Sequence, residues 1–471
     1  MAADSQALRL HPENPHYFEF RGKPTVLITS AEHYGAVMNQ DFDYSKFLET
    51  LAKHHFNLTR LFTGAAYCEP SGAFGITENT LAPKKGRFLP PWKRSDQPGA
   101  WDGGTKWDLT AWNEHYFYLL KDFVSLASQH GIIVEVNLFC PFYEDKSHQS
   151  KMWPLSPFHP DNNINGLGNI LSHDVYTMDK HGGLLEVQER FVRQVVESLK
   201  EFDNVYYEIC NEPYFAGVTL EWQHHMADVI SEALRKTESP KLISQNIANG
   251  SAHVENPHPA VSIFNFHYTY PPKVVAENST LNKVIGENET GFRGNADEVY
   301  RNEAWDFLMA GGALFNNLDY SFAVGHEDGS YAYPPRTPGG GGPSFWSQLE
   351  VLVNFMNSLD FVKMRPAAEF ITAVSNGASL KGLANPGVEY AFYLHHSAAP
   401  GWTNKTKLQT GNFADRFTLL IPEGSYELEW IEPRTGEELR KESREHGEGL
   451  LELTSPKYTQ DVALHIRRKV R

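Results

Sequence analysis

The stretch Asn204-Val-Tyr-Tyr-Glu-Ile-Cys-Asn-Glu-Pro213 is the most informative in the chain, because an apolar and aromatic run ends in a carboxylate and a proline. Such a run is typical of a strand buried on both faces of a parallel sheet. Pro213 ends the strand and favours an extended or turn conformation at Glu212. The stretch therefore predicts a carboxylate at the carboxyl-terminal end of a buried strand.

Further runs of this kind alternate with amphipathic helical patterns. The predicted strands are 24–30, 57–62, 132–138, 204–210, 241–246, 261–267, 282–289 and 312–317, and the predicted helices are 44–55, 113–130, 184–202, 220–236, 297–309 and 344–358. Eight strands, most of them followed by helices, predict an α/β fold of the (β/α)8 TIM-barrel type. A doubly wound sheet is the alternative, but residues 30–35 after the first strand lack the expected GxGxxG turn.

The charge balance excludes some classes of partner. The 471 residues include 42 Lys and Arg against 58 Asp and Glu, a formal net charge of −16. This disfavours nucleic acid as a partner, because phosphates require a basic face. The longest apolar run, 307–315, is shorter than the ~20 residues that span a bilayer, so we expect no membrane helix. The oligomeric state is left open.

Cysteine and histidine patterns argue against metals and cofactors. Cys68, Cys140 and Cys210 stand far apart without a CxxC motif, so neither a disulfide framework nor a zinc ribbon is expected. No HExxH, P-loop or GxSxG motif occurs, and we predict no catalytic metal and no cofactor. The first ten residues lack a signal-peptide pattern, which predicts a cytoplasmic protein, or a secreted one if a leader has been trimmed.

A second candidate carboxylate ends the predicted strand 282–289. Glu287 and Glu289 are two residues apart, so regular strand geometry predicts that both point the same way. In a barrel, the fourth and seventh strands lie on opposite sides of the mouth, and Glu212 can face one of these glutamates. Such a pair is the machinery of glycoside hydrolysis, and a separation of about 5–5.5 Å leads to retention of configuration.

The barrel order, the Asn211-Glu212-Pro213 motif and the glutamate ending the seventh strand resemble clan A glycoside hydrolases, especially cellulase-like family 5 and its relatives. The resemblance implies that Glu212 is the acid/base and Glu289 the nucleophile. Glu287, which follows a glycine, is the second choice. The expected reaction is hydrolysis of a carbohydrate substrate with retention.

Further positions match the same families. Arg60 resembles the arginine that keeps the nucleophile ionised, and Asn211 resembles the asparagine that contacts the sugar 2-hydroxyl. His267 and Tyr268 resemble the His-x-Tyr that supports the nucleophile, although the spacing leaves Tyr270 as an alternative tyrosine. These residues form the expected supporting shell.

The sugar-binding surface is less well defined. His33 and Tyr34 follow the first strand and are candidates for the innermost sugar subsite. Many clan members end the eighth strand near a tryptophan, whereas this chain has Leu-Asp-Tyr-Ser-Phe at 318–322. Phe315, Tyr320 or a loop tryptophan would have to provide the platform.

Two long segments, 64–112 and 139–183, follow the second and third strands, where barrels build their active face. The first carries Trp92, Trp101, Trp107 and Trp112, which suit a carbohydrate cleft. Such loops could wall off one end of the cleft and favour exo-action on short oligosaccharides.

After residue 366 helical patterns give way to short strands predicted at 389–395, 417–421, 426–430, 449–454 and 461–466. This spacing predicts an antiparallel β-sandwich. The Trp-x-x-Pro-Arg-Thr-Gly turn at 430–436 resembles the small β-sandwich labelled a collagen-binding domain that follows such barrels in bacterial hydrolase-like proteins. The expected domains are a lead-in at 1–22, the barrel at 23–362 and an accessory sandwich at 363–471.

Two other functions compete with this interpretation. A non-catalytic barrel that binds glycans or proteins would keep the aromatic cleft, yet could dispense with one of the two carboxylates. An aldolase or lyase would need a lysine at a strand end for a Schiff base, and the predicted strand ends offer none.

Overall fold

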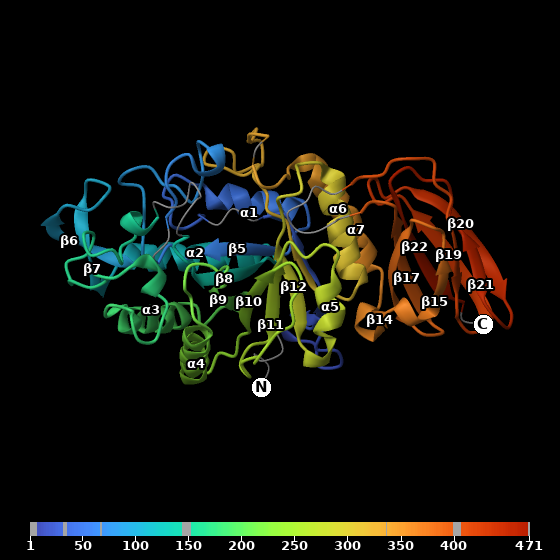
Figure 1. The fold of residues 1–471 in the computed structure, drawn as a ribbon, viewed down its shortest axis with the longest axis horizontal. Helices are drawn as coiled ribbons and strands as arrows, with labels where there is room; N and C mark the ends of the chain where they lie inside the picture. Colours follow the sequence, from blue (N-terminus) through green and yellow to red (C-terminus); the bar gives the residue numbers. More distant parts are fainter. Residues whose placement is uncertain are drawn as a thin grey trace.

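The computed structural model describes residues 7–31, 35–65, 68–143, 152–335, 337–398 and 407–469. An eight-stranded parallel sheet curves into a barrel with helices around it, and antiparallel sheets follow at the carboxyl-terminal end (Figure 1). The predicted TIM barrel followed by a small β-sandwich is therefore confirmed. None of the helices in these ranges is long and apolar enough to cross a membrane.

The barrel strands are short, apolar and buried, as the sequence pattern predicts. Their order in the sheet is β4-β13-β12-β11-β10-β9-β8-β5, and every paired neighbour is parallel. The bounds are β4 Leu27–Thr29, β5 Leu58–Phe62, β8 Ile133–Phe139, β9 Val205–Cys210, β10 Ile243–Asn249, β11 Ile263–His267, β12 Val284–Glu289 and β13 Leu314–Asn316.

The barrel closes between β4 and β5 through a side chain. The amide of Asn57 donates to the carbonyl of Val26 at 2.8 Å and accepts from the backbone N–H of Ile28 at 2.9 Å. This amide satisfies both backbone groups where the two strands meet, as a ladder hydrogen bond would. The candidate glutamates lie at the other end of the barrel, at the carboxyl-terminal ends of β9 and β12.

The six predicted helices occur in the predicted order, and a further short helix, Lys273–Glu277, was not predicted. The helices outside the sheet are α1 Tyr44–Lys53, α2 Glu114–Gln129, α3 Leu184–Ser198, α4 Leu220–Lys236, α5 Lys273–Glu277, α6 Asp297–Met309 and α7 Pro343–Asn357. Asp43 caps α1 by accepting from the N–H of Lys46 at 3.1 Å. No helix connects β10 to β11 within the described residues 250–262, as expected from that short, proline-containing segment.

A small antiparallel sheet lies at the amino-terminal end of the barrel. It consists of β1 Arg9–Leu10, β2 Phe18–Phe20 and β3 Lys23–Thr25. Leu8 donates its N–H to the carbonyl of Asp203, which precedes β9, and Arg21 pairs with the Asp203 carboxylate at 2.7 Å. The lead-in segment therefore covers the end of the barrel away from the candidate site.

The long segments after β5 and β8 hold each other in place. The first forms a hairpin of β6 Trp92–Pro98 and β7 Thr105–Trp112. Trp107 donates its N–H to the carbonyl of Asn162 at 2.8 Å, and its own carbonyl accepts from Ile164 at 3.0 Å. Trp92 and Trp107 are fully buried. The expectation that these two tryptophans suit a sugar cleft is wrong, because they pack the loops together.

Two antiparallel sheets form the carboxyl-terminal sandwich, with orders β14-β16-β17-β22-β19-β20 and β15-β18-β21. The bounds are β14 Arg365–Pro366, β15 Ile371–Val374, β16 Ser379–Asn385, β17 Glu389–His395, β18 Arg416–Leu419, β19 Gly424–Ile431, β20 Glu438–His446, β21 Leu451–Thr454 and β22 Asp461–Arg468. Phe392 and Trp430 of the larger sheet share one core with Phe417 and Leu453 of the smaller sheet.

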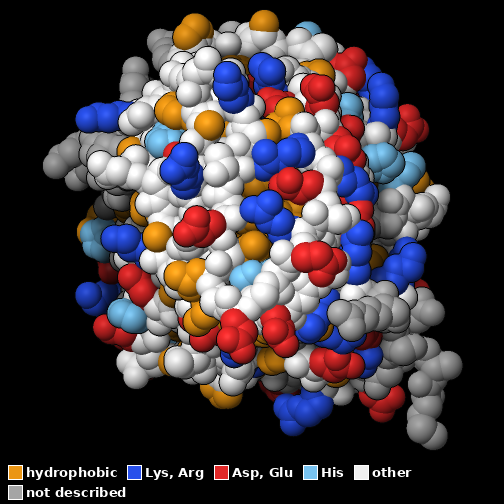
Figure 2. Space-filling model, turned by 90° about the vertical axis from the view of Figure 1, so that its right-hand side faces the viewer, with side chains coloured by type: hydrophobic (Ala, Val, Ile, Leu, Met, Phe, Trp, Pro, Cys, Tyr) orange, Lys and Arg blue, Asp and Glu red, His pale blue; other side chains and the backbone are white. Residues whose placement is uncertain are grey.

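The sequence missed β20 because this edge strand carries charge instead of an apolar alternation. Basic and acidic side chains are interspersed on the face of the molecule at the sandwich end (Figure 2). Lys441 of β20 pairs with Glu427 of β19 at 2.7 Å. Charged side chains on an edge strand oppose pairing with another molecule's strand.

The barrel and the sandwich meet at α6, which is buried on all sides. Arg301 of α6 donates two hydrogen bonds to the carboxylate of Asp461 in β22, at 2.8 and 3.0 Å. The hydroxyl of Tyr393 in β17 lies 2.6 Å from the same carboxylate and 2.7 Å from the side-chain amide of Asn302. The two parts are thus joined by buried polar contacts in addition to apolar packing.

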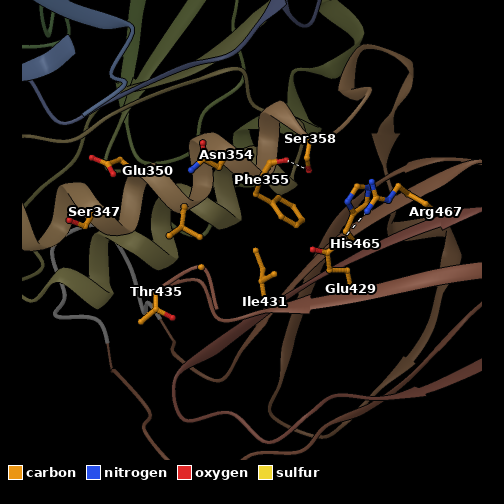
Figure 3. Close-up of a pocket in the computed structure, with 12 residues that line it drawn as sticks. Ser347, Glu350, Asn354, Phe355, Ser358, Glu429, Ile431, Thr435, His465 and Arg467 are labelled. Carbon is orange, nitrogen blue, oxygen red and sulfur yellow. Dashed lines mark hydrogen bonds and ion pairs between the residues drawn. The ribbon is translucent and has the colours of Figure 1, made fainter. Parts of the chain in front are cut away.

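Beside this interface, a groove of about 610 Å³ runs between α7 and the strands β19 and β22 (Figure 3). Phe355 of α7 and Ile431 of β19 point toward one another across it. The charged residues that line its far side are paired, Arg467 with Glu429 at 3.0 Å and His465 with Glu389 at 2.7 Å.

Candidate active site

Glu212 lies two residues after Cys210, the last residue of β9, and is held in an uncommon backbone conformation. Its φ of 38° lies in the left-handed region, which a non-glycine residue adopts only when its surroundings enforce it. The N–H of Glu212 donates to the side chain of Asn246 in β10 at 3.1 Å. Tyr143 donates to carboxylate Oε2 at 2.5 Å, and the hydroxyl of Tyr214, which donates to Asn249 Oδ1, lies 3.4 Å from Oε1. These contacts aim the carboxyl group at the barrel mouth.

Glu289, the last residue of β12, lies opposite Glu212. Arg60 Nη1 donates to its Oε2 at 3.2 Å, and the hydroxyl of Tyr268 donates to its Oε1. His267 Nδ1 lies between the two glutamates, 3.4 Å from Glu212 Oε1 and 3.6 Å from Glu289 Oε2. The carboxyl oxygens of Glu212 and Glu289 and the His267 nitrogen all lie within 4.8 Å of one another. The two carboxyl groups therefore face a common space.

The prediction that Glu287 and Glu289 point the same way is wrong. A bulge in β12 shifts the register with β11, so that Phe266 pairs with Glu287 but the next residue, His267, pairs with Glu289. Glu287 turns away from the mouth and accepts the N–H of Thr269 at 2.7 Å. The extra residue of a bulge changes the direction of the side chains that follow it, and here it brings Glu289 to Glu212.

The two candidate tyrosines also separate. Tyr268 reaches Glu289, and its φ of 55° turns the backbone there after β11. The hydroxyl of Tyr270 lies 3.5 Å from Nε2 of His395 in the sandwich. Of the two alternatives that the spacing left open, the structure brings Tyr268 to the candidate nucleophile.

The surroundings of the two facing carboxyl groups, Glu212 and Glu289, differ. Burial raises the pKa of Glu212 above its ordinary value, which favours the protonated form. Glu289 instead lies 3.2 Å from the permanently charged guanidinium of Arg60. Arg60 Nη2 also donates to Asn211 Oδ1 at 2.8 Å, which places the Asn211 side chain beside the guanidinium that contacts Glu289.

Burial also lowers the pKa of His267 to about 4, so this histidine is neutral in the folded protein at neutral pH. An unfolded chain binds a proton at this residue below about pH 6.5, whereas the folded chain does not. We therefore expect His267 to remove about 3 kcal/mol of stability as the pH falls from about 6.5 to 4. Urea unfolding of wild type and His267→Gln across this range measures the effect, and parallel pH curves would contradict it.

Glu212, His267 and Glu289 are also the one group in the described ranges whose donor atoms lie close enough together to hold a metal ion. The guanidinium of Arg60 lies 3.2 Å from Glu289, and its charge opposes a second cation there. Tyr143 and Tyr268 donate to the same carboxyl groups. These neighbours suit a pair of carboxyl groups that work on a substrate better than a metal site.

The remaining predicted residues lie elsewhere. His33 and Tyr34 fall outside the described residues. Tyr320 packs in an apolar cluster with Ile76 and Leu318, and Phe315 is fully buried. The expectation that Phe315 provides a sugar platform is therefore wrong.

Exposed aromatic side chains flank the two glutamates instead. Tyr214 and Phe215 follow Glu212 and are 36% and 40% exposed, while Phe292 follows Glu289 and is 42% exposed. The ring of Phe292 lies edge-on to Tyr268, with centroids 5.2 Å apart. Sequence reasoning missed these rings and Tyr143, although the first three directly follow the motifs that identified the glutamates.

Comparisons with known proteins show the fold but no family for the whole chain. Residues 86–250 match a family model described as a domain of unknown function, DUF6298. No curated protein matches.

Solved structures with the same fold cover nearly the whole chain. A candidate glycoside hydrolase from Bacteroides vulgatus ATCC 8482 has a TM-score of 0.66 and 13% identity, covering 100% of this chain and 83% of its own. A glycoside hydrolase has a TM-score of 0.64 and 10% identity, covering 99% and 98%. A family 5 glycoside hydrolase from the same Bacteroides strain has a TM-score of 0.60 and 12% identity, covering 99% and 94%. At these identities the likeness concerns the fold.

Proposed function

We propose that this protein is a retaining β-glycoside hydrolase that acts by double displacement on an oligo- or polysaccharide. The observation that carries the proposal is the approach of Glu212 and Glu289, whose nearest oxygens lie within 4.8 Å. Retaining enzymes hold their carboxyl groups about 5–5.5 Å apart, whereas inverting enzymes need room for a water molecule between carboxylate and sugar. The fold shared with glycoside hydrolases supports the proposal.

In the first step, the carboxylate of Glu289 attacks the anomeric carbon while Glu212 donates its proton to the glycosidic oxygen. The bond to the leaving sugar breaks, and an ester bond to Glu289 forms. Burial raises the pKa of Glu212 above its ordinary value, which favours the protonated form that this task requires. Arg60 and Tyr268 hold Glu289 in place as the nucleophile.

In the second step, Glu212 accepts a proton from water, and the water oxygen attacks the same carbon. The ester bond breaks, the Glu289 carboxylate is restored and Glu212 is again protonated. Formation of the ester removes the charge of Glu289, which lowers the pKa of Glu212 and prepares it as a base. Two inversions give net retention.

The loops support a closed cleft, and we propose exo-action on short chains. The hairpin β6–β7 and the segment around residue 163 are joined by backbone hydrogen bonds at Trp107. This joined pair stands beside the end of the barrel on the β5 and β8 side (Figure 1). Tyr214, Phe215 and Phe292 offer exposed rings on which the apolar faces of sugars can stack.

The test is hydrolysis of a panel of aryl β-glycosides followed by proton NMR of the freshly released sugar. We expect the β-anomer to appear first and the α-anomer only later, through mutarotation. First appearance of the α-anomer would contradict the retaining mechanism. Binding of oligosaccharides without hydrolysis of any member of the panel would favour the non-catalytic alternative. Internal cleavage of a long glycan would contradict exo-action.

A further inference from the structure

Three carboxyl groups surround one guanidinium beneath the candidate active site. Glu135 of β8, Glu208 of β9 and Glu289 of β12 lie 3.5, 2.7 and 3.2 Å from nitrogens of Arg60 in β5. The side chains of Arg60, Glu135 and Glu208 are completely buried. Were all three carboxyl groups ionised, one positive charge would face three negative charges away from water. Carboxyl groups that share such a site retain a proton on one of them.

Hydrogen bonds indicate which of the three carboxyl groups carries the proton. Arg60 donates to Glu208 Oε2 from Nε at 3.0 Å and from Nη2 at 2.7 Å, and Asn288 adds a third donor at 3.2 Å. None of the described residues donates to Oε1 of Glu208. Burying an ionised oxygen without a donor is costly, whereas a protonated oxygen is itself a donor.

Both oxygens of Glu135, by contrast, receive hydrogen bonds. Tyr206 donates to Oε2 at 2.7 Å, and the side chains of Asn288 and Asn265 donate to Oε1 at 2.9 and 3.2 Å. This pattern is that of an ionised carboxylate. Asn288 bridges Glu135 and Glu208 because the bulge in β12 turns its side chain into the barrel.

We propose that Glu208 is a positioning residue that is protonated on Oε1, donates that proton toward Glu135 and holds Arg60 against Glu289 through Oε2. The inference rests on the proposed function, in which Glu289 is the nucleophile. A neutral Glu208 orients the guanidinium without neutralising it. The charge of Arg60 is then available to Glu289.

The surroundings agree with this arrangement. Burial raises the pKa of Glu208 well above its ordinary value, and Glu135 raises it further while Arg60 opposes the change. Burial likewise raises the pKa of the nearby Tyr206 and Cys210, which are therefore uncharged at neutral pH.

The first test needs no substrate. The folded protein keeps the proton of Glu208 at pH values where the unfolded chain has lost it, so stability falls as the pH rises above about 4.5. Glu208→Gln retains the acceptor oxygen and removes the titration. We expect the difference in melting temperature, Glu208→Gln minus wild type, to increase as the pH is raised from about 5 to 8. A constant or falling difference would overturn the proposal.

Infrared difference spectra identify directly which residue carries the proton. Wild type minus Glu208→Gln at neutral pH should contain the carbonyl band of a protonated carboxylic acid. Glu135→Gln should lose the same band, because Glu208 then ionises beside Arg60. A carboxylate band in place of the protonated band in the Glu208→Gln difference would overturn the proposal even if no glycoside is hydrolysed.

The positioning role is tested with an aryl glycoside that the wild-type protein hydrolyses. The quantity measured is the acid limb of the pH profile of kcat/KM. Glu208→Ala releases Arg60, and we expect the limb to rise by about one pH unit. Glu208→Gln should restore the wild-type limb, because the oxygen that holds Arg60 is present. A limb raised in Glu208→Gln would show that a charge is required there, and would overturn the proposal whether or not Glu208→Ala folds.

Discussion

Glu289→Ala is expected to lower kcat/KM on an aryl β-glycoside by at least about 10⁴-fold, because the proposed nucleophile is gone. The substitution removes only the side chain that Arg60 and Tyr268 hold, so the loss should appear mainly in kcat. Azide can enter the space of the missing side chain and attack the anomeric carbon directly. The product should be a glycosyl azide of inverted configuration, identified by NMR.

Glu212→Ala is expected to give a different signature. An activated aryl leaving group departs without a proton, so ester formation continues, while hydrolysis of the ester slows by about 10²–10⁴-fold. Azide then attacks the anomeric carbon of the glycosyl ester, the Glu289 carboxylate leaves, and the product is the glycosyl azide of retained configuration. Opposite azide products from the two variants would assign the two roles.

Glu287→Gln is the matched control, because Glu287 is on the same strand but faces Thr269 instead of the mouth. Burial raises the pKa of Glu287 well above its ordinary value, so glutamine resembles the form that is present. We expect turnover close to wild type. A large loss in Glu287→Gln together with an active Glu289→Ala would reverse the assignment.

Arg301→Met is expected to cost about 3–5 kcal/mol of stability, because it leaves the buried carboxylate of Asp461 without its positive partner. The exposed fractions of the two side chains are 1% and 0%. The loss should appear in urea unfolding followed by tryptophan fluorescence.

The matched control is Arg467→Met, since Arg467 pairs with Glu429 at 3.0 Å but is 45% exposed. Surface pairs contribute about 1 kcal/mol or less. The double variant Arg301→Met/Asp461→Asn should recover much of the loss if an unpaired charge is its cause. Similar small losses in both single variants would show that the contact between α6 and the sandwich does not depend on this ion pair.

The barrel was predictable because each buried strand has an apolar pattern that can be recognised within its own short stretch of sequence. Residues 204–210 and 261–267 are mostly apolar or aromatic along their whole length, as is typical of parallel strands covered by helices. The facing of Glu212 and a glutamate of β12 followed from strand order alone. The edge strand β20 was not predictable, because both of its faces meet water and no apolar period remains.

Details of the site depended on contacts that no local pattern encodes. Tyr143 reaches Glu212 from a separate segment after β8, and Trp107 is buried because two long loops meet over it. The choice between Glu287 and Glu289 was decided by a bulge opposite Phe266 and His267. A bulge reflects how two strands fit together, so one strand's sequence does not reveal it.

By itself, the sequence determined an eight-stranded α/β barrel, a following β-rich domain and carboxylates at the ends of the fourth and seventh strands. Only the tertiary structure decided that Glu289 faces Glu212, that Tyr268 and Arg60 hold it, and that Glu135 and Glu208 lie buried beneath it. The reason is physical: hydrophobic periodicity records what each segment buries, whereas pKa values and hydrogen bonds depend on groups brought together from different strands.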